Sequence, residues 1–167
     1  MLKLACEKGS ICVGHLLDRG TNCMIDKFFV DTNILIYAHD TSAGVKHKRA
    51  RALIEDLWNS GKGVLSTQVL QELCINLRRK VSRPLPMEEL RLLVRDYLTW
   101  EVISNTPESV LRALEFETRY KTSFWDALIL QAAETSNASV LYSEDLATGG
   151  HYGTIRVVNP LVAVAGP

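Results

Sequence analysis

The sequence predicts a three-layer α/β/α domain around a mainly parallel sheet of short strands. Short apolar runs alternate with helical patterns, which is typical of parallel strands joined by right-handed crossovers. The 167 residues are enough for one ordinary domain, and 47% hydrophobic residues are enough to fill its core. Because 19 basic and 19 acidic side chains give a formal net charge of +0, any site for a polyanion must be local.

Residues 1–26 differ from the rest of the chain, because they show no convincing periodicity. From Lys27 onward almost every segment matches a helix or strand pattern, and Met24 stands just before that change. We therefore interpret residues 1–26 as an N-terminal extension, with Met24 as the natural start and the residues before it an upstream extension or a poorly ordered arm. Residues 27–161 form the predicted domain and residues 162–167 a C-terminal tail.

The cysteines and the hydropathy predict a reducing, cytoplasmic setting. Cys6, Cys12, Cys23 and Cys74 form no C-x-x-C pair, so neither a disulfide framework nor a zinc site is expected. No apolar run approaches the roughly 20 residues that span a bilayer, and we expect no membrane association.

The first elements follow from an apolar run and a helical stripe. Lys27–Asp31 suits a strand buried on both faces with a polar group at its tip, and a short helical turn follows at 34–37. Residues 46–59 have the periodicity of a helix that Gly61 ends. Its predicted buried face comprises Ala50, Leu53, Ile54, Leu57 and Trp58.

The middle of the chain repeats this alternation. Residues 64–66 read as a strand, and residues 67–80 as a helix with Leu70, Leu73 and Leu77 along one stripe. The segment 82–86 is a rigid break, and Pro86 suits the first position of a helix that runs to about Tyr97.

The last third contains the clearest helix signals. Residues 101–104 read as a strand, and Thr106 followed by Pro107 is a strong start for a helix that reaches Tyr120. The next helix begins at Ser123 and is nearly apolar all round, as expected of a central helix. The remaining predicted strands are 139–142 and 154–158.

Four acids are predicted to meet at one rim of the sheet, because loops and helix N-termini converge beyond the carboxyl ends of parallel strands. They are Asp31 after the first strand, Glu72 early in the helix after the second, Asp126 in the first turn of the apolar helix, and Asp145 after the strand at 139–142. Crowded carboxylates repel one another unless a cation neutralises them, and oxygen ligands suit Mg²⁺ or Mn²⁺. The predicted chemistry is metal-assisted phosphodiester hydrolysis.

Each acid also has a purely structural interpretation. Asp31 can cap the helical turn that follows it, Glu72 can be a solvated helix residue, and Asp126 can complete a capping box with Ser123. Asp126 has the stronger case for a partner, because apolar residues follow it three and four positions later.

The fourth acid has a neighbouring competitor, because two acids stand side by side at 144–145. Asp145 can merely enter a turn, and its neighbour Glu144 is the rival ligand.

Five segments, in this order, resemble the PIN-domain nucleases, and especially the VapC-like toxins of bacterial toxin–antitoxin modules. The resemblance covers residues 27–161 and implies the PIN-like version of the predicted fold. The segments are Phe29–Leu35, Gln71–Leu73, Trp125–Ile129, Leu141–Leu146 and Arg156–Pro160.

The resemblance implies a Mg²⁺- or Mn²⁺-dependent ribonuclease whose acidic site is Asp31, Glu72, Asp126 and Asp145. It also implies that Asn33 orients Asp31 and that the Ser143 hydroxyl contacts a carboxylate or water. Alternatively, Asn33 and Ser143 cap local turns. Ala147 stands where many family members carry a further acid, which puts a second metal ion in doubt.

An RNA substrate requires cations around the acidic centre. The predicted RNA contacts are Arg78, Arg79, Lys80 and Arg83, which can equally form a solvated helix end. The resemblance further implies a homodimer and a small antitoxin partner. Apolar residues near the 84–86 break and along the helix at 86–97 can form the partner surface or can belong to the core.

Two other functions fit the same sequence. One is a PIN-domain nuclease that acts in RNA maturation or on structured DNA. The other is a catalytically silent module that binds RNA or a protein. The four intact acids favour an enzyme over the silent module.

Overall fold

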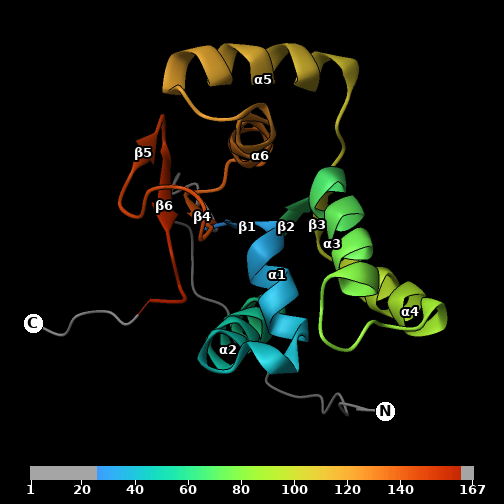
Figure 1. Cartoon of the computed structure of the whole chain (residues 1–167). Helices are drawn as coiled ribbons and strands as arrows, with labels where there is room; N and C mark the ends of the chain where they lie inside the picture. Colours follow the sequence, from blue (N-terminus) through green and yellow to red (C-terminus); the bar gives the residue numbers. More distant parts are fainter. Residues whose placement is uncertain (1–25, 163–167) are drawn as a thin grey trace, which may run out of the picture.

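A computed structural model describes residues 26–162 and contains the predicted α/β/α domain (Figure 1). The six strands form one sheet in the order β3-β2-β1-β4-β6-β5. The strands are β1 (Phe28–Val30), β2 (Gly63–Ser66), β3 (Glu101–Ile103), β4 (Val140–Tyr142), β5 (His151–Tyr152) and β6 (Ile155–Val158). The helices are α1 (Thr32–His39), the 3₁₀ turn η1 (Thr41–Ala43), α2 (Val45–Ser60), α3 (Thr67–Arg79), α4 (Met87–Tyr97), α5 (Pro107–Tyr120) and α6 (Phe124–Thr135).

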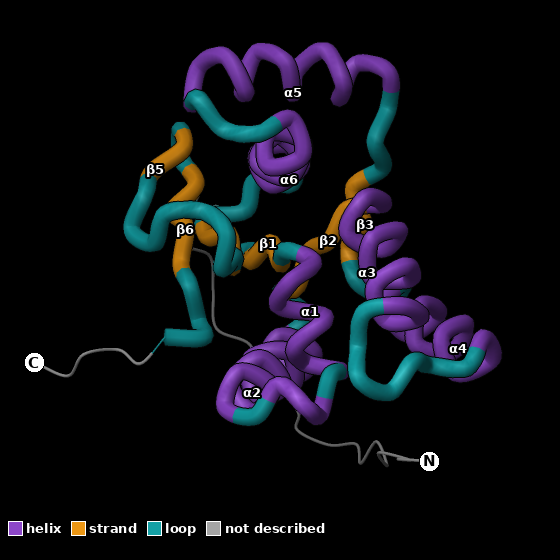
Figure 2. The backbone as a smooth tube through the Cα atoms, in the orientation of Figure 1, coloured by secondary structure: helices purple, strands orange, loops and turns teal. Residues whose placement is uncertain are grey.

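Helices cover both faces of the sheet. In Figure 1, α5 and α6 lie on one side, α1 and α2 on the other, and α3 with α4 beside the β3 end. Figure 2 shows how short the strands are compared with the helices around them. All neighbouring strands pair in parallel except β5 and β6. The fold class expected from the alternating pattern is therefore confirmed.

Local signals begin and end the helices as expected. Thr106 caps α5 through the Ser109 amide, with Pro107 at the first helical position. Gly61 ends α2 in the left-handed conformation, with φ of 66°. Pro86 is an exception: it precedes α4 as the N-cap residue instead of being its first helical residue.

Three elements differ from the sequence expectation, one of them the unpredicted 3₁₀ turn η1. The helical turn expected at 34–37 is the longer α1, because the Asp31 side chain caps a helix that begins at Thr32. Strand β5 was not predicted, since two residues are too few to show a periodicity. It pairs antiparallel with β6 across a turn at Gly153, where φ is 64°.

The core lies on both sides of the sheet and includes the middle of α6, where every residue from Ala127 to Ala133 is buried. The start of that helix departs from the expectation of an all-round apolar burial, because Trp125 is 63% exposed. Within residues 26–162, no helix combines the length and hydrophobicity required to cross a bilayer.

The strand order creates a crevice beside β1. After β1 the chain adds β2 and β3 on one side of it, and β4 later pairs on the other side. In such sheets the crevice opens beyond the carboxyl ends of the strands at the point where the order reverses. The predicted extension at 1–26 and tail at 162–167 lie outside the described residues, apart from Asp26 and Val162.

Candidate functional site

Asp31 occupies the end of β1, where the chain turns into α1. Its Oδ1 accepts a hydrogen bond from the Thr32 amide at 2.6 Å, and its own amide donates to the Tyr142 carbonyl of β4 at 2.9 Å. The residue is only 8% exposed. Burial raises the pKa of Asp31 to about 6, and the carboxylates of Asp145 and Glu72 add to the increase. Asp31 is therefore both a helix cap and a buried acid near other acids.

Ser143 and Asn33 hold the Asp31 carboxylate in place. The buried Ser143 hydroxyl donates to Asp31 Oδ2 at 2.7 Å and accepts from the Asp145 amide at 3.1 Å. Asn33 Nδ2 donates to Asp145 Oδ2 at 2.9 Å and reaches Asp31 Oδ2 at 3.4 Å. The two interpretations of Ser143 coexist, because one hydroxyl closes the turn and contacts the carboxylate.

Glu72 reaches the same region from the second turn of α3. Its Oε2 accepts from the Thr32 hydroxyl at 2.8 Å, and its Oε1 accepts from Gln68 Nε2 at 2.9 Å. Asn76, one turn later, donates to the Glu72 backbone carbonyl at 2.8 Å. These contacts tie the Glu72 side chain to α1, so it is not a freely solvated helix residue.

Asp126 lies in the first turn of α6. Its Oδ2 accepts from the Ser123 hydroxyl at 2.8 Å and from the Thr122 hydroxyl at 3.2 Å, and its amide donates to Ser123 Oγ. Ser123 therefore caps the helix through the Asp126 amide, but the capping box is incomplete, because the Asp126 carboxylate accepts from the Ser123 hydroxyl and not from the Ser123 amide. Asp126 also lines the cleft that contains Asp31, as does Ile129 one turn later.

The turn after β4 separates the two rival acids. Asp145 faces Asn33 and lines the cleft. Glu144 instead forms an ion pair with Lys46 of α2 and does not line the cleft. Although burial works in the opposite direction, Lys46 and Tyr37 hold the pKa of Glu144 below its ordinary value. Of the two acids, Asp145 is therefore the one available to the cleft.

All four predicted acids line one cleft of about 390 Å³, although they come from four separate parts of the chain. Asp31 and Asp126, which sequence reasoning required to lie together, do so. The lining residues are Asp31, Thr32, Asn33, Ile36, Gln68, Glu72, Asn76, Lys80, Trp125, Asp126, Ile129 and Asp145.

The donor atoms in this cleft fit a hydrated divalent cation. Asn33 Oδ1 and Gln68 Oε1 are buried beside the carboxylates and accept no hydrogen bond from the described residues, so they have capacity for a water or cation. Within residues 26–162, no three acidic, histidine or cysteine side chains converge closely enough to enclose an ion. Mg²⁺ usually keeps several waters and takes only one or two carboxylates, which the cleft can provide.

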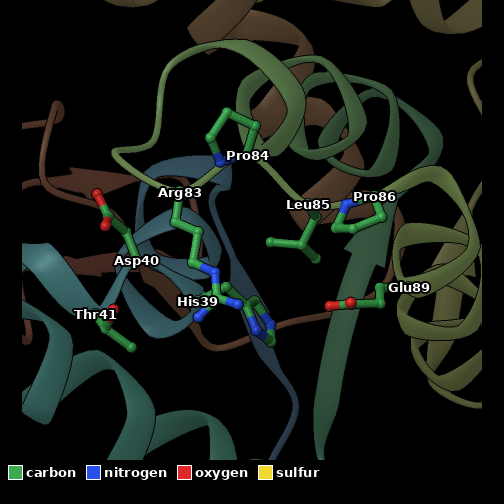
Figure 3. Close-up of a pocket in the computed structure, with 8 residues that line it drawn as sticks. All are labelled: His39, Asp40, Thr41, Arg83, Pro84, Leu85, Pro86 and Glu89. Atoms are coloured by element: carbon green, nitrogen blue, oxygen red, sulfur yellow. The ribbon is translucent and has the colours of Figure 1, made fainter.

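The structure separates the basic cluster that was predicted to contact RNA. Lys80 lines the acidic cleft. Arg78 lines a groove between α3 and α4, and the exposed Arg79 lines neither. Arg83 lines a pocket of about 290 Å³ with His39 and the 84–86 segment, where its side chain extends toward the His39 ring (Figure 3).

Thr32, Gln68 and Trp125 are among the cleft residues to which the sequence assigns no role. Gln68 is only 4% exposed, and its Nε2 also reaches the Trp125 carbonyl of α6 at 3.3 Å. The signal for Gln68 was its position one turn before Glu72 on the same helix face. Trp125 directly precedes Asp126, but its exposure could not be read from an apolar pattern.

Comparisons with known proteins find a matching domain profile and solved structures of similar fold. The sequence profile of the PIN domain matches residues 28–147. No curated protein sequence matches the chain. Among solved structures, a toxin–antitoxin complex from Klebsiella pneumoniae is similar, with 20% identity, a TM-score of 0.59, and coverage of 81% of this chain and 98% of that chain.

Two further solved structures have the same fold. VapC20 of Mycobacterium tuberculosis, described as a toxin that cleaves the sarcin–ricin loop, is 21% identical with a TM-score of 0.55, covering 71% of this chain and 90% of that chain. DNA-bound VapBC from Salmonella typhimurium is 19% identical with a TM-score of 0.55, covering 80% and 97%.

Proposed function

Because this chain belongs to the PIN domain family, we propose that it is a divalent-metal-dependent endoribonuclease and the toxin of a toxin–antitoxin pair. The observation that carries the proposal is the convergence of four carboxylates from separate elements on one cleft. Without a cation, such a concentration of acids is unfavourable. Burial is the main cause of the raised pKa of Asp31, and the nearby carboxylates of Asp145 and Glu72 add to it. A site of this kind is suited to a metal and an anionic substrate together.

Asp31, Glu72, Asp126 and Asp145 would hold Mg²⁺ or Mn²⁺, directly or through its waters. When bound, the ion lowers the pKa of a water and neutralises charge on the phosphate. The chain's own residues position the acids: Ser143 and Asn33 hold Asp31 and Asp145, and Thr32 and Gln68 hold Glu72. Their hydrogen bonds keep the carboxylate oxygens facing the cleft.

Lys80 is the proposed contact for the RNA backbone in the cleft, because it is the one of the four predicted cations that lines it. Its ammonium supplies positive charge beside the acids, where a phosphate must approach. Arg78, Arg79 and Arg83 lie outside this cleft and remain predictions for RNA that extends beyond it.

RNA hydrolysis by the purified protein tests the proposal directly. A panel of RNAs is incubated with Mg²⁺, Mn²⁺ or EDTA, using the native protein and its Asp31→Asn and Asp126→Asn variants. We expect metal-dependent cleavage that each substitution slows by at least about 100-fold, since the metal provides several kcal/mol of transition-state stabilisation. Glu144→Gln is the matched control and should cut at the native rate, because Glu144 pairs with Lys46 outside the cleft.

Cleavage in EDTA, or full activity in both aspartate variants, would overturn the mechanism. Cleavage of DNA or of precursor RNA alone would instead favour a nuclease of nucleic-acid maturation. Absence of cleavage with RNA binding retained would favour a silent binding module.

The antitoxin partner is supported by the toxin–antitoxin complexes among the similar structures. A groove of about 380 Å³ along α4 fits an apolar, acidic segment, because Met87 and Leu98 are exposed at it and Arg78, Arg91 and Arg95 also line it. Leu90 and Tyr97 of the same region belong to the core.

Expression of the protein should arrest growth, and a small protein from an adjacent gene should relieve the arrest. Arrest that persists in Asp31→Asn would contradict a toxin acting by hydrolysis. The homodimer remains a prediction that sedimentation tests.

A further inference from the structure

Trp125 presents a large aromatic surface to solvent at the edge of the acidic cleft. The side chain is 63% exposed and lines the cleft directly beside Asp126 in the first turn of α6. Its backbone is held by the hydrogen bond from Gln68, and its ring contacts Phe124 edge-on, with centroids 5.6 Å apart. The indole is therefore anchored on one side and open on the other.

The other two tryptophans each make two aromatic contacts, although Trp58 is 36% exposed and not buried as the helical stripe predicts. Trp58 and Trp100 lie 5.0 Å apart by ring centroid, and each contacts the buried Tyr97. Trp125 is the only aromatic side chain among the described residues that line the cleft. Its exposure removes the usual benefit of burying an indole, so packing does not explain its place.

We propose that Trp125 is a nucleobase-binding residue whose indole stacks on an unpaired base of the substrate. The inference rests on the proposed nuclease function and adds to it a residue that contacts the substrate. Trp125 and Asp126 are consecutive at the same rim, so a base on the indole brings its own phosphate toward the carboxylates. Lys80 across the cleft, on the α3 side, then meets the backbone.

The base must be unpaired because a paired base inside a helix has both faces covered by its neighbours. Sequence-specific and single-strand RNA binding accordingly depends on unstacked bases against aromatic side chains. Every base has a π-face, so stacking on Trp125 selects unpaired RNA without selecting one base. Ile36 and Ile129 add apolar surface to the same cleft.

Fluorescence of Trp125 tests the contact. The Asp31→Asn protein is titrated with a short unstructured oligoribonucleotide and, separately, with the same strand annealed to its complement. The signal of Trp125 is taken as the difference between this protein and its Trp125→Phe counterpart. We expect the single strand to quench the difference signal and the duplex to leave it nearly unchanged.

Steady-state cleavage by variants with an intact Asp31 tests the consequence. Trp125→Leu should raise KM for unpaired RNA by about 10-fold, the range found for loss of one stacked base, with kcat nearly unchanged because stacking is equal in substrate and transition state. Trp125→Phe should restore most of the affinity. Leu111→Ala is the control, since Leu111 is 64% exposed on α5 and does not line the cleft.

The outcomes separate the two proposals. If the native protein cuts RNA and Trp125→Leu has a native KM, stacking is overturned and the nuclease stands. Equal quenching by the duplex also overturns it. Trp125 could instead be covered by a second copy of the chain. The indole of the free protein would then be shielded from solvent, and Trp125→Leu would lower the sedimenting mass from dimer to monomer. That result would overturn stacking. If the native protein neither binds nor cuts RNA, both proposals fail.

Discussion

The two ends of the sheet differ in the side chains that gather there, acids at one end and aromatic rings at the other. Beyond the carboxyl ends of β1 and β4 lies the acidic cleft, where four carboxylates share about 390 Å³. At the amino ends of β2 and β3, Trp58, Tyr97 and Trp100 form an aromatic cluster with ring centroids 4.7–5.5 Å apart. A Cβ at Gly63, where β2 begins, would lie 2.2 Å from the Trp100 ring, so the cluster packs against bare backbone.

Each end buries a titratable group with a shifted pKa. Burial raises the pKa of Asp31 to about 6, and burial lowers the pKa of His39, beside the aromatic cluster, to about 4. His39 Nε2 lies 2.8 Å from the Tyr97 hydroxyl, so the neutral imidazole has a partner. The Asp31 carboxyl also has hydrogen-bond partners, in Thr32 and Ser143, but it lies near the carboxylates of Asp145 and Glu72 as well. A shifted pKa alone therefore does not distinguish the two ends; the further carboxylates beside Asp31 do.

The largest expected effect tests whether the aromatic cluster serves stability alone. Tyr97 is fully buried, so Tyr97→Ala should lower the free energy of unfolding by about 3–4 kcal/mol. Tyr97→Phe keeps the ring and should cost only about 1 kcal/mol through the lost hydrogen bond to His39. Urea unfolding measures both. RNA cleavage per folded molecule should stay native, and its loss would show that the two ends are coupled.

The second-largest expected effect is on the pH dependence of stability in the metal-free protein, where Asp31 and His39 act in opposite directions. In the folded protein the pKa of Asp31 is about 6, whereas in the unfolded chain it is near 3.8. The folded state therefore holds the proton more tightly, and this favours folding at low pH. The stabilisation, up to about 3 kcal/mol, is lost as the pH rises from 3.8 to 6. His39, with a pKa lowered from 6.5 to about 4, contributes stability that is lost as pH falls through that window.

Urea unfolding in EDTA at several pH values separates these contributions. Relative to the native protein, Asp31→Asn should gain stability as pH rises from 4 to 6, and His39→Gln should lose stability over the same range. Millimolar Mg²⁺ should weaken the Asp31 effect, because a bound cation favours the charged carboxylate. Parallel curves for all three proteins would refute the contrast between the two ends.

The smallest expected effect concerns Gln68, which positions the acid Glu72 in the cleft. Gln68 holds Glu72 and the Trp125 carbonyl, so Gln68→Ala should weaken Mg²⁺ binding by about 10- to 100-fold. A titration of RNA cleavage against Mg²⁺ measures this change. Gln71→Ala, an exposed glutamine on the same helix, is the matched control. Equal metal dependence in the two variants would remove Gln68 from the site.

Much of the fold could be predicted because its signals are local. The Thr106–Pro107 start, the Gly61 end and the apolar stripes each act within a few residues, and these signals identified five of the six α-helices of the described chain, with α1 expected only as a short turn. Strand β5 escaped prediction because its two residues are held by β6, not by their own pattern. The four acids were named from the ends of strands and the starts of helices, where parallel sheets gather functional groups.

By itself the sequence determined the order of elements, the fold class and which acids were candidates for one cleft. Only the tertiary structure decided that Glu144 pairs with Lys46 while Asp145 faces Asn33. It also decided that Lys80 lines the cleft while Arg78 and Arg83 face other pockets. The physical reason is that periodicity sets which residues share a face, whereas the direction of adjacent side chains in a turn depends on contacts with residues far away in the chain.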